Sequence, residues 1–209
     1  MRGLLLALVL GACGGSPPVS AAPQNALAAD SMVALVDEEG RSYCAGTMLQ
    51  LERVILTAAH CVEGEASVEV ALYRDLSEDQ THFLVGRSVR VLRIDHDADL
   101  ATLSLPRGYS GLVRLAGHDP VPGEPIVLCG HPVGLTYVCD TGHVSGGTRH
   151  GPFGREGFFV VDAGIYFGHS GGPTFDQNGD LLGVNSFFVG TPILAGIVSP
   201  DIIRTFLSQ

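Results

Sequence analysis

Three short segments of the chain carry residues that could together perform nucleophilic catalysis. The segment GHSGGP places Ser170 between glycines, so little side-chain bulk surrounds its hydroxyl. A serine is a poor nucleophile until a base takes its proton, and that base is usually a histidine. His60 follows an apolar run in VILTAAHC, and Asp99 opens the alternating run DLATLSL. These residues are therefore a candidate nucleophile, base and orienting acid.

Simpler interpretations exist for each of the three residues. A serine-glycine turn is most often a surface loop, and a histidine after a strand can be a core residue. Asp95 and Asp97 could replace Asp99 as the orienting acid, although only Asp99 directly precedes the apolar strand. Other histidines lack the spacing of a metal site, so we expect them in loops and expect no metal or cofactor. They are His82, His96, His118, His131, His143 and His150.

The elements that must position these residues are predicted to be short strands. Apolar runs separated by turn residues recur along the chain, and helical periodicity is missing until its end. The predicted strands include 32–36, 43–49, 67–74, 88–94, EPIVLCGH and FFVVDAG. Ser199 is a candidate helix cap, and Pro200 suits the first turn of a C-terminal helix. The glycine-rich segment 142–157 is predicted to be a loop. The fold class is therefore all-β, a sandwich or a barrel.

Composition and charge narrow the possible partners. The 209 residues are 45% hydrophobic and include 28 glycines and 12 prolines, as in a loop-rich globular domain. Lys and Arg number 12 against 22 acidic residues, which gives a formal charge of −10. Such an acidic chain argues against nucleic acid as a partner.

The N-terminal stretch MRGLLLALVLGAC predicts export. Its apolar run, Leu4 to Leu10, is too short to span a bilayer, so residues 1–12 are predicted to be a signal peptide. The run ends in LGAC, which resembles the lipobox of bacterial lipoproteins. That resemblance implies an acylated Cys13, a flexible tether over 13–30 and possible membrane attachment in the periplasm or cell envelope. The alternative is ordinary secretion with cleavage after Ala22.

Taken in chain order, LTAAHC, DADLATLSL and GHSGGP resemble the chymotrypsin-fold, trypsin-like serine proteases. From IVLCGHPVGL through VDAGIYFGHSGGP to GDLLGVNSFFVGTPILAGIVSP, the chain is most similar to bacterial HtrA-type proteases, and we expect no PDZ domain after it. The resemblance covers residues 31–209. It implies two six-stranded antiparallel β-barrels, joined near 108–122 and followed by a C-terminal helix, with the catalytic cleft between them.

The resemblance also implies roles for individual residues. Ser170 would attack the scissile carbonyl, His60 would move the proton, and the N–H groups of Gly168 and Ser170 would form the oxyanion hole. Ser186 would hydrogen-bond Asp99. The substrate pocket would contain Gly164, Ile165, Asn185, Phe187 and Phe188. Because no acid lies among these pocket residues, we expect small or medium apolar residues at the cleavage site rather than Arg or Lys.

One departure from the animal relatives concerns activation. Those proteases are cut to expose an N-terminal amine that pairs with an acid directly before the serine. Here that position is His169, and the chain has no Ile-Val-Gly-Gly start. The site is therefore expected to assemble without such cleavage, with His169 hydrogen-bonded or simply exposed.

Cysteine usage fits an exported protein. If Cys13 is set aside, four of the five cysteines remain, and sequence alone leaves three pairings open. The resemblance implies the pair Cys44–Cys61, which is common in animal members. Cys129 and Cys139 flank a predicted hairpin, and their pairing would close a short loop.

The sequence therefore predicts a serine endopeptidase, secreted or lipid-anchored, that acts on protein or peptide substrates through an acyl-enzyme. Two alternatives stay open at this point. One is a binding protein of the same fold with a vestigial site, and the other is a serine esterase that uses the same three residues.

Overall fold

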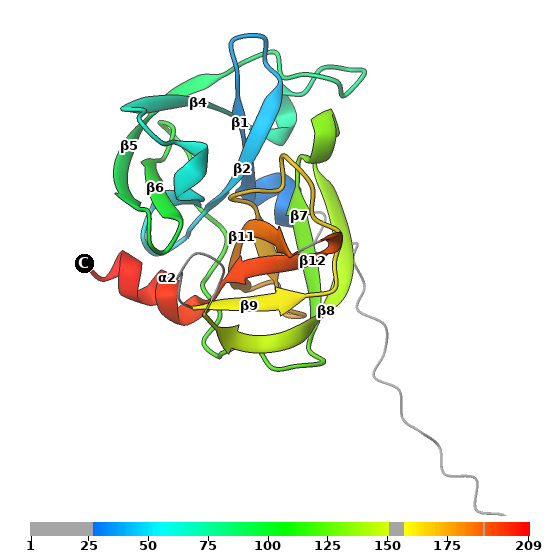
Figure 1. Cartoon of the computed structure of the whole chain (residues 1–209). Helices are drawn as coiled ribbons and strands as arrows, with labels where there is room; N and C mark the ends of the chain where they lie inside the picture. Colours follow the sequence, from blue (N-terminus) through cyan, green and yellow to red (C-terminus); the bar gives the residue numbers. More distant parts are fainter. Residues whose placement is uncertain (1–26, 151–156, 190) are drawn as a thin grey trace, which may run out of the picture.

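The computed structural model describes residues 27–150, 157–189 and 191–209. The predicted signal peptide, Cys13 and the tether up to residue 26 lie outside the described residues. Residues 27–30, also predicted to belong to the flexible tether, are instead helical, and Ala28, which is 1% exposed, packs in the core. Figure 1 shows two groups of strands, one above the other, with the C-terminal helix α2 against the lower group. Among the described residues, no helix is both long and apolar enough to cross a membrane.

Each group of strands closes into a six-stranded barrel. The first barrel contains β1 (Met32–Val36), β2 (Ser42–Met48), β3 (Val54–Thr57), β4 (Ser67–Ala71), β5 (Arg87–Asp95) and β6 (Leu100–Ser104). The second contains β7 (Pro125–Gly130), β8 (Val138–Arg149), β9 (Phe158–Val161), β10 (Pro173–Phe175), β11 (Leu181–Val189) and β12 (Thr191–Val198). Short 3₁₀ turns are η1 (Ala59–Cys61), η2 (Tyr73–Asp75) and η3 (Pro132–Gly134), and α2 spans Pro200–Leu207.

The two barrels share one strand order. The first runs β1-β2-β3-β6-β5-β4, and the second runs β7-β8-β9-β12-β11-β10 when it is read from its own first strand. Neighbouring strands pair antiparallel, for example β1 with both β2 and β4. The expected fold of two six-stranded antiparallel barrels with a C-terminal helix is therefore confirmed.

Apolar side chains fill three layers of the molecule. One cluster fills the first barrel and includes Val33 and Leu35 of β1, and another fills the second barrel. A third cluster lies between the barrels, where Met32 on the opposite face of β1 meets Phe158 and Phe206 of the second half. β1 is buried at all five positions because both of its faces are covered, which explains its continuous apolar run.

The expectation of a loop over 142–157 was wrong for residues 142–149, and residues 151–156 lie outside the described part of the chain. Residues 142–149 belong to β8, in which Val144 and Gly146 are buried between more exposed neighbours. Small glycines hid this alternation in the sequence. Ser199 occupies the N-cap position of α2, yet its side chain makes no capping hydrogen bond. Ser199 N donates to Gly157 O, which ties the start of α2 to the residue directly before β9.

Two disulfides tie neighbouring elements together. Cys44 of β2 is bonded to Cys61 at the end of η1, with Cα atoms 6.1 Å apart. Cys129 of β7 is bonded to Cys139 of β8, its direct partner in the strand register. Both pairings agree with those expected from the sequence.

Candidate active site

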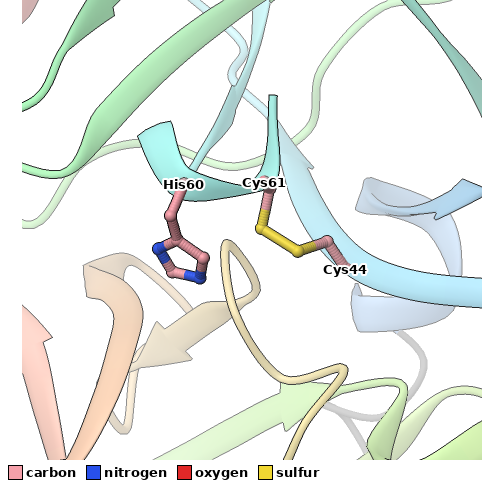
Figure 2. A group of neighbouring side chains, drawn as sticks. All are labelled: Cys44, His60 and Cys61. Atoms are coloured by element: carbon pink, nitrogen blue, oxygen red, sulfur yellow. A yellow bond between two sulfur atoms is a disulfide. The ribbon is translucent and has the colours of Figure 1, made fainter. Parts of the chain in front are cut away.

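His60 lies on the short turn η1, directly after strand β3. Buried Ala58 and Ala59 precede it and allow the turn to pack closely on the barrel. Figure 2 shows the imidazole hanging below this turn toward the second barrel, while the neighbouring Cys61 is bonded to Cys44. The imidazole is 40% exposed, so a short turn holds the ring where solvent can reach it.

Asp99 is buried beside this imidazole at the turn between β5 and β6. Its carboxylate oxygens both lie 3.0 Å from His60 Nδ1, and Oδ1 also accepts a hydrogen bond from His60 N at 3.1 Å. The residue is 1% exposed. Because Nδ1 faces a carboxylate, it carries the proton in the neutral ring, and Nε2 remains free to act as a base.

The second barrel supplies another partner to the same carboxylate. Ser186 of β11 donates its hydroxyl to Asp99 Oδ2, across the boundary between the barrels. Burial acts to raise the pKa of Asp99, but the hydrogen bonds from His60 and Ser186 outweigh it and hold that pKa below its usual value. Asp99 is therefore an anion at neutral pH that orients His60 and can stabilise its charged form.

The alternative acids have other positions. Asp95 Oδ1 accepts a hydrogen bond from Ala98 N at 2.9 Å and so shapes the turn that leads to Asp99. Asp97 is exposed on the same turn. Asp99 itself has a φ of +53°, a conformation that few non-glycine residues adopt and that aims its side chain inward.

Ser170 lies in a turn of the second barrel that is seated directly on the first. Its carbonyl oxygen accepts a hydrogen bond from Ala45 N at 2.8 Å and lies 3.7 Å from Cys61 Sγ. The next residue, Gly171, has a φ of +79°, and a Cβ there would lie 2.2 Å from both Ala45 O and Thr57 Oγ1. Only glycine fits this close approach.

These contacts bring the Ser170 segment beside the His60 turn. Among the described residues, no hydrogen bond joins the Ser170 hydroxyl to His60. Catalytic hydrogen bonds in substrate-free sites are often long and tighten only when substrate binds. The structure therefore shows the hydrogen-bonded pair of His60 and Asp99 and the main-chain hydrogen bond that fixes Ser170 on the first barrel.

The segment from Gly168 to Ser170 contains two main-chain N–H groups that are candidate oxyanion donors. Gly168 has a φ of +101°. Within the described part of the chain, neither Gly168 N nor Ser170 N has a hydrogen-bond acceptor, whereas the neighbouring His169 N donates to Tyr166 O at 3.1 Å. Two N–H groups without an acceptor in the described residues, one of the serine itself and one two residues before it, can receive a developing negative charge.

His169 occupies the position where animal relatives have an acid, and it is buried rather than exposed. Its Nδ1 accepts a hydrogen bond from Tyr166 N at 3.1 Å. Burial lowers the pKa of His169, so the ring is neutral at physiological pH. His131, expected in a loop, does lie just after β7, but it is buried there, and burial lowers its pKa to about 3.

The residues expected to form the substrate pocket have different environments. Gly164 is partly exposed and its N–H donates to Asp140 Oδ2, while Ile165 is buried. Phe187 packs edge-on against Phe158, with ring centroids 5.0 Å apart. The buried side chain of Asn185 is tied inward by hydrogen bonds described below.

An exposed aromatic pair lies next to these residues. Phe188 is 49% exposed and packs edge-on against Phe167, which is 81% exposed. Sequence reasoning missed Phe167, although its place directly before Gly168 was a usable signal. It also missed the inward role of the Asn185 side chain, for which the sequence offered no signal.

Two groups of potential metal ligands occur among the described residues. In Cys44, His60 and Cys61 both sulfurs belong to the disulfide, so the imidazole is the one remaining ligand. In the other, His118 Nε2 lies 2.7 Å from Glu124 Oε1, and the nearby Asp176 accepts hydrogen bonds from two backbone N–H groups. Both groups are explained by bonds within the protein.

Comparison with known proteins gives consistent results. A family model described as a trypsin-like peptidase domain matches residues 44–184. The chain is 31% identical to serine protease HTRA1A of Danio rerio over 171 residues, 78% of this chain and 34% of the relative. It is 33% identical to a probable periplasmic serine endoprotease, DegP-like, of Halomonas elongata over 154 residues, 71% of this chain and 30% of the relative.

These matches confirm the resemblance to HtrA-type proteases. The chain spans about a third of the length of the curated relatives it matches. Among solved structures, the HtrA-type protease AlgW with a tripeptide has a TM-score of 0.74 at 22% identity, and covers 90% of this chain and 62% of its own. A protease of M. tuberculosis in its active form has a TM-score of 0.72 at 18% identity over 100% of this chain and 92% of its own. These likenesses agree with the two-barrel fold.

Proposed function

Since the chain belongs to the trypsin-like peptidase family, we propose that it is a serine endopeptidase in which Ser170, His60 and Asp99 form the catalytic triad. Ser170 Oγ bonds to the scissile carbonyl carbon while His60 Nε2 accepts the hydroxyl proton. The carbonyl oxygen becomes an oxyanion and takes hydrogen bonds from Gly168 N and Ser170 N. When the C–N bond breaks, His60 returns the proton to the leaving amine, and water then releases the acyl group by the same steps.

A single observation carries this proposal: His60 Nδ1 is held on the buried Asp99 carboxylate while the main chain of Ser170 is bonded to the same barrel that carries His60. A base with a fixed tautomer beside an exposed hydroxyl is what acyl transfer requires. The N–H groups of Gly168 and Ser170 would stabilise the negative charge of the oxyanion. Loss of one such donor typically lowers kcat by about 10²- to 10³-fold.

Labelling with a fluorophosphonate probe tests the nucleophile. The probe should label the wild-type protein and fail to label Ser170→Ala, while Ser145→Ala, which removes an exposed serine of the same barrel, should label normally. A wild-type protein that does not react would support a vestigial binding protein. Turnover of peptide and ester substrates with the same acyl group then separates an endopeptidase from an esterase.

Substrate preference is proposed to be apolar, through a shallow pocket formed by Gly164, Ile165, Phe187 and Phe188, whereas the side chain of Asn185, first expected there, is turned inward and does not line it. The exposed rings of Phe188 and Phe167 support this proposal, because contact with an apolar side chain would remove both from water. A peptide library should show small or medium apolar residues before the cleaved bond. A profile dominated by basic or acidic residues would reject the pocket.

Location is proposed from the sequence and from the relatives. A probable periplasmic endoprotease among them supports export, and LGAC supports acylation at Cys13. Metabolic labelling with a fatty-acid analogue should mark the wild-type protein and not Cys13→Ala. An unlabelled but exported wild-type protein would instead support cleavage after Ala22.

A further inference from the structure

Asn185 of β11 is a buried amide whose polar atoms all have partners. The residue is 0% exposed. Its Oδ1 accepts a hydrogen bond from Thr174 Oγ1 at 2.6 Å, and its Nδ2 donates to Cys129 O at 2.9 Å and to His169 O at 3.3 Å. Because both partners of Nδ2 are carbonyl oxygens, the amide must have this orientation. Asn185 therefore links the end of β7 to the residue before the nucleophile.

The bond to His169 O fixes more than a carbonyl group. The peptide bond between His169 and Ser170 is trans and planar, so the carbonyl of His169 and the N–H of Ser170 point in opposite directions. Asn185 Nδ2, together with Gly172 N at 3.0 Å, holds the carbonyl on the inner side. The Ser170 N–H is thereby turned outward, where the oxyanion is proposed to form.

The other oxyanion donor is held in the same manner. The carbonyl of Phe167 accepts a hydrogen bond from Val133 N at 2.9 Å, which turns the N–H of Gly168 to the opposite side. His131 N also donates to Gly168 O at 3.0 Å. The Gly168 donor thus depends on the chain that leaves β7, and the Ser170 donor depends on Asn185, whose Nδ2 also binds Cys129 O near the end of β7.

We propose that Asn185 is a positioning residue for the oxyanion hole: it fixes the peptide plane that carries the Ser170 donor without touching the substrate. This inference rests on the proposed function. It expects substrate binding to survive the loss of Asn185, because the ground-state carbonyl needs the donors less than the oxyanion does. The rate of acyl transfer should fall.

The variant Asn185→Leu tests the inference because leucine is similar in size and cannot donate. We expect kcat to fall by about 10- to 100-fold while KM changes less than about twofold. The control is Thr47→Val. Thr47 is a buried threonine of the first barrel whose hydroxyl has no hydrogen-bond partner among the described residues, and its replacement should leave kcat unchanged.

A matched pair of inhibitors separates positioning from general loosening of the fold. A peptide aldehyde forms a tetrahedral adduct that uses the oxyanion hole, and the corresponding peptide alcohol does not. In Asn185→Leu the aldehyde should lose affinity by the same factor as kcat/KM, while the alcohol should bind as in the wild type. The inference would be overturned if the affinities of the aldehyde and the alcohol fell equally, or if neither affinity fell.

Two further results keep the inference separate from the proposed function. If Asn185→Leu does not fold, Asn185→Ala, which removes the amide donors without adding bulk or charge, replaces it with the same expected outcomes. If the wild-type protein reacts with neither the aldehyde nor a fluorophosphonate, the proposed function fails. If the wild type reacts and the variant matches it, only the role of Asn185 fails.

Discussion

The two barrels have the same strand order and contribute different kinds of chemistry. The first supplies side chains, since His60 and Asp99 meet through side-chain atoms across 39 residues of sequence. The second supplies Ser170 and the unpaired N–H groups beside it, and these depend on where the main chain turns. In the first barrel the site depends on side-chain atoms of His60 and Asp99, and in the second the Asn185 side chain holds main-chain groups through Cys129 O and His169 O.

This difference shows which parts of a site can be recognised in a sequence and which cannot. Side-chain chemistry is visible in the sequence as residue types at particular positions. Main-chain chemistry can be supplied by any residue, because every residue but proline carries an N–H group. Its function depends on peptide planes that are set by distant contacts.

The largest expected loss of activity follows removal of the proposed base in one barrel or the proposed nucleophile in the other. His60→Ala in the first barrel and Ser170→Ala in the second should each lower kcat by about 10⁴- to 10⁶-fold. The double variant should be about as slow as either single variant, since the two residues act as one unit. Steady-state kinetics on a peptide substrate measure this, and additive losses would show that the two barrels act independently.

The next effect concerns the acid that both barrels share. Asp99→Asn should lower kcat at neutral pH by about 10³- to 10⁴-fold because the tautomer of His60 is no longer fixed. Ser186→Ala, on the second barrel, should cost about tenfold or less, since His60 still holds the carboxylate. Asp97→Asn is the control on the same turn and should be silent. A larger loss in Ser186→Ala than in Asp99→Asn would reverse the assignment.

The same contrast explains how much could be predicted from the sequence. His60, Asp99 and Ser170 were predicted as the site because of their residue types and flanking motifs, and the structure places the His60 turn, the Asp99 carboxylate and the Ser170 segment together. The barrels followed from apolar runs, except where glycines such as Gly146 concealed the alternation in β8. The buried positions of His131 and His169, and the inward amide of Asn185, could not be predicted. They depend on contacts between β7, β11 and the nucleophile turn that no local pattern records.

A smaller effect compares the two disulfides. Replacing Cys44 and Cys61 together by alanine, or Cys129 and Cys139 together, should lower the free energy of unfolding by about 3 kcal/mol in each case, because both bonds close short loops. Urea unfolding of each variant measures this. The wild-type midpoint should also fall when reductant is added, and an unchanged midpoint would show that the bonds do not stabilise the protein.

The smallest expected effect is a difference in how Asp75 and His118, from the two halves of the molecule, make the free energy of unfolding depend on pH. In the first, burial acts to raise the pKa of Asp75, but hydrogen bonds from Arg87 and Leu72 N outweigh it and keep this pKa below 3.8. The stability that Asp75 provides is therefore complete above that value and is lost as the pH falls through the lower folded pKa. Asp75→Asn should flatten this acid limb, by on the order of 1 kcal/mol.

In the second barrel the sign is opposite. The hydrogen bond to Glu124 raises the pKa of His118 above 6.5. Its contribution is complete below 6.5 and is lost as the pH rises through the folded pKa. His118→Gln should flatten the alkaline side of the profile and leave the acid limb intact. Urea unfolding between pH 3 and 9 compares both variants, and a change at the same end in both would contradict the assignment.

The bond from Ala45 N to Ser170 O couples the two barrels at the proposed nucleophile. If the barrels moved apart at this point, the serine would lose the main-chain contact that holds it on the first barrel. Loosening of the boundary between the barrels is therefore expected to reduce the proposed activity even while each barrel stays folded.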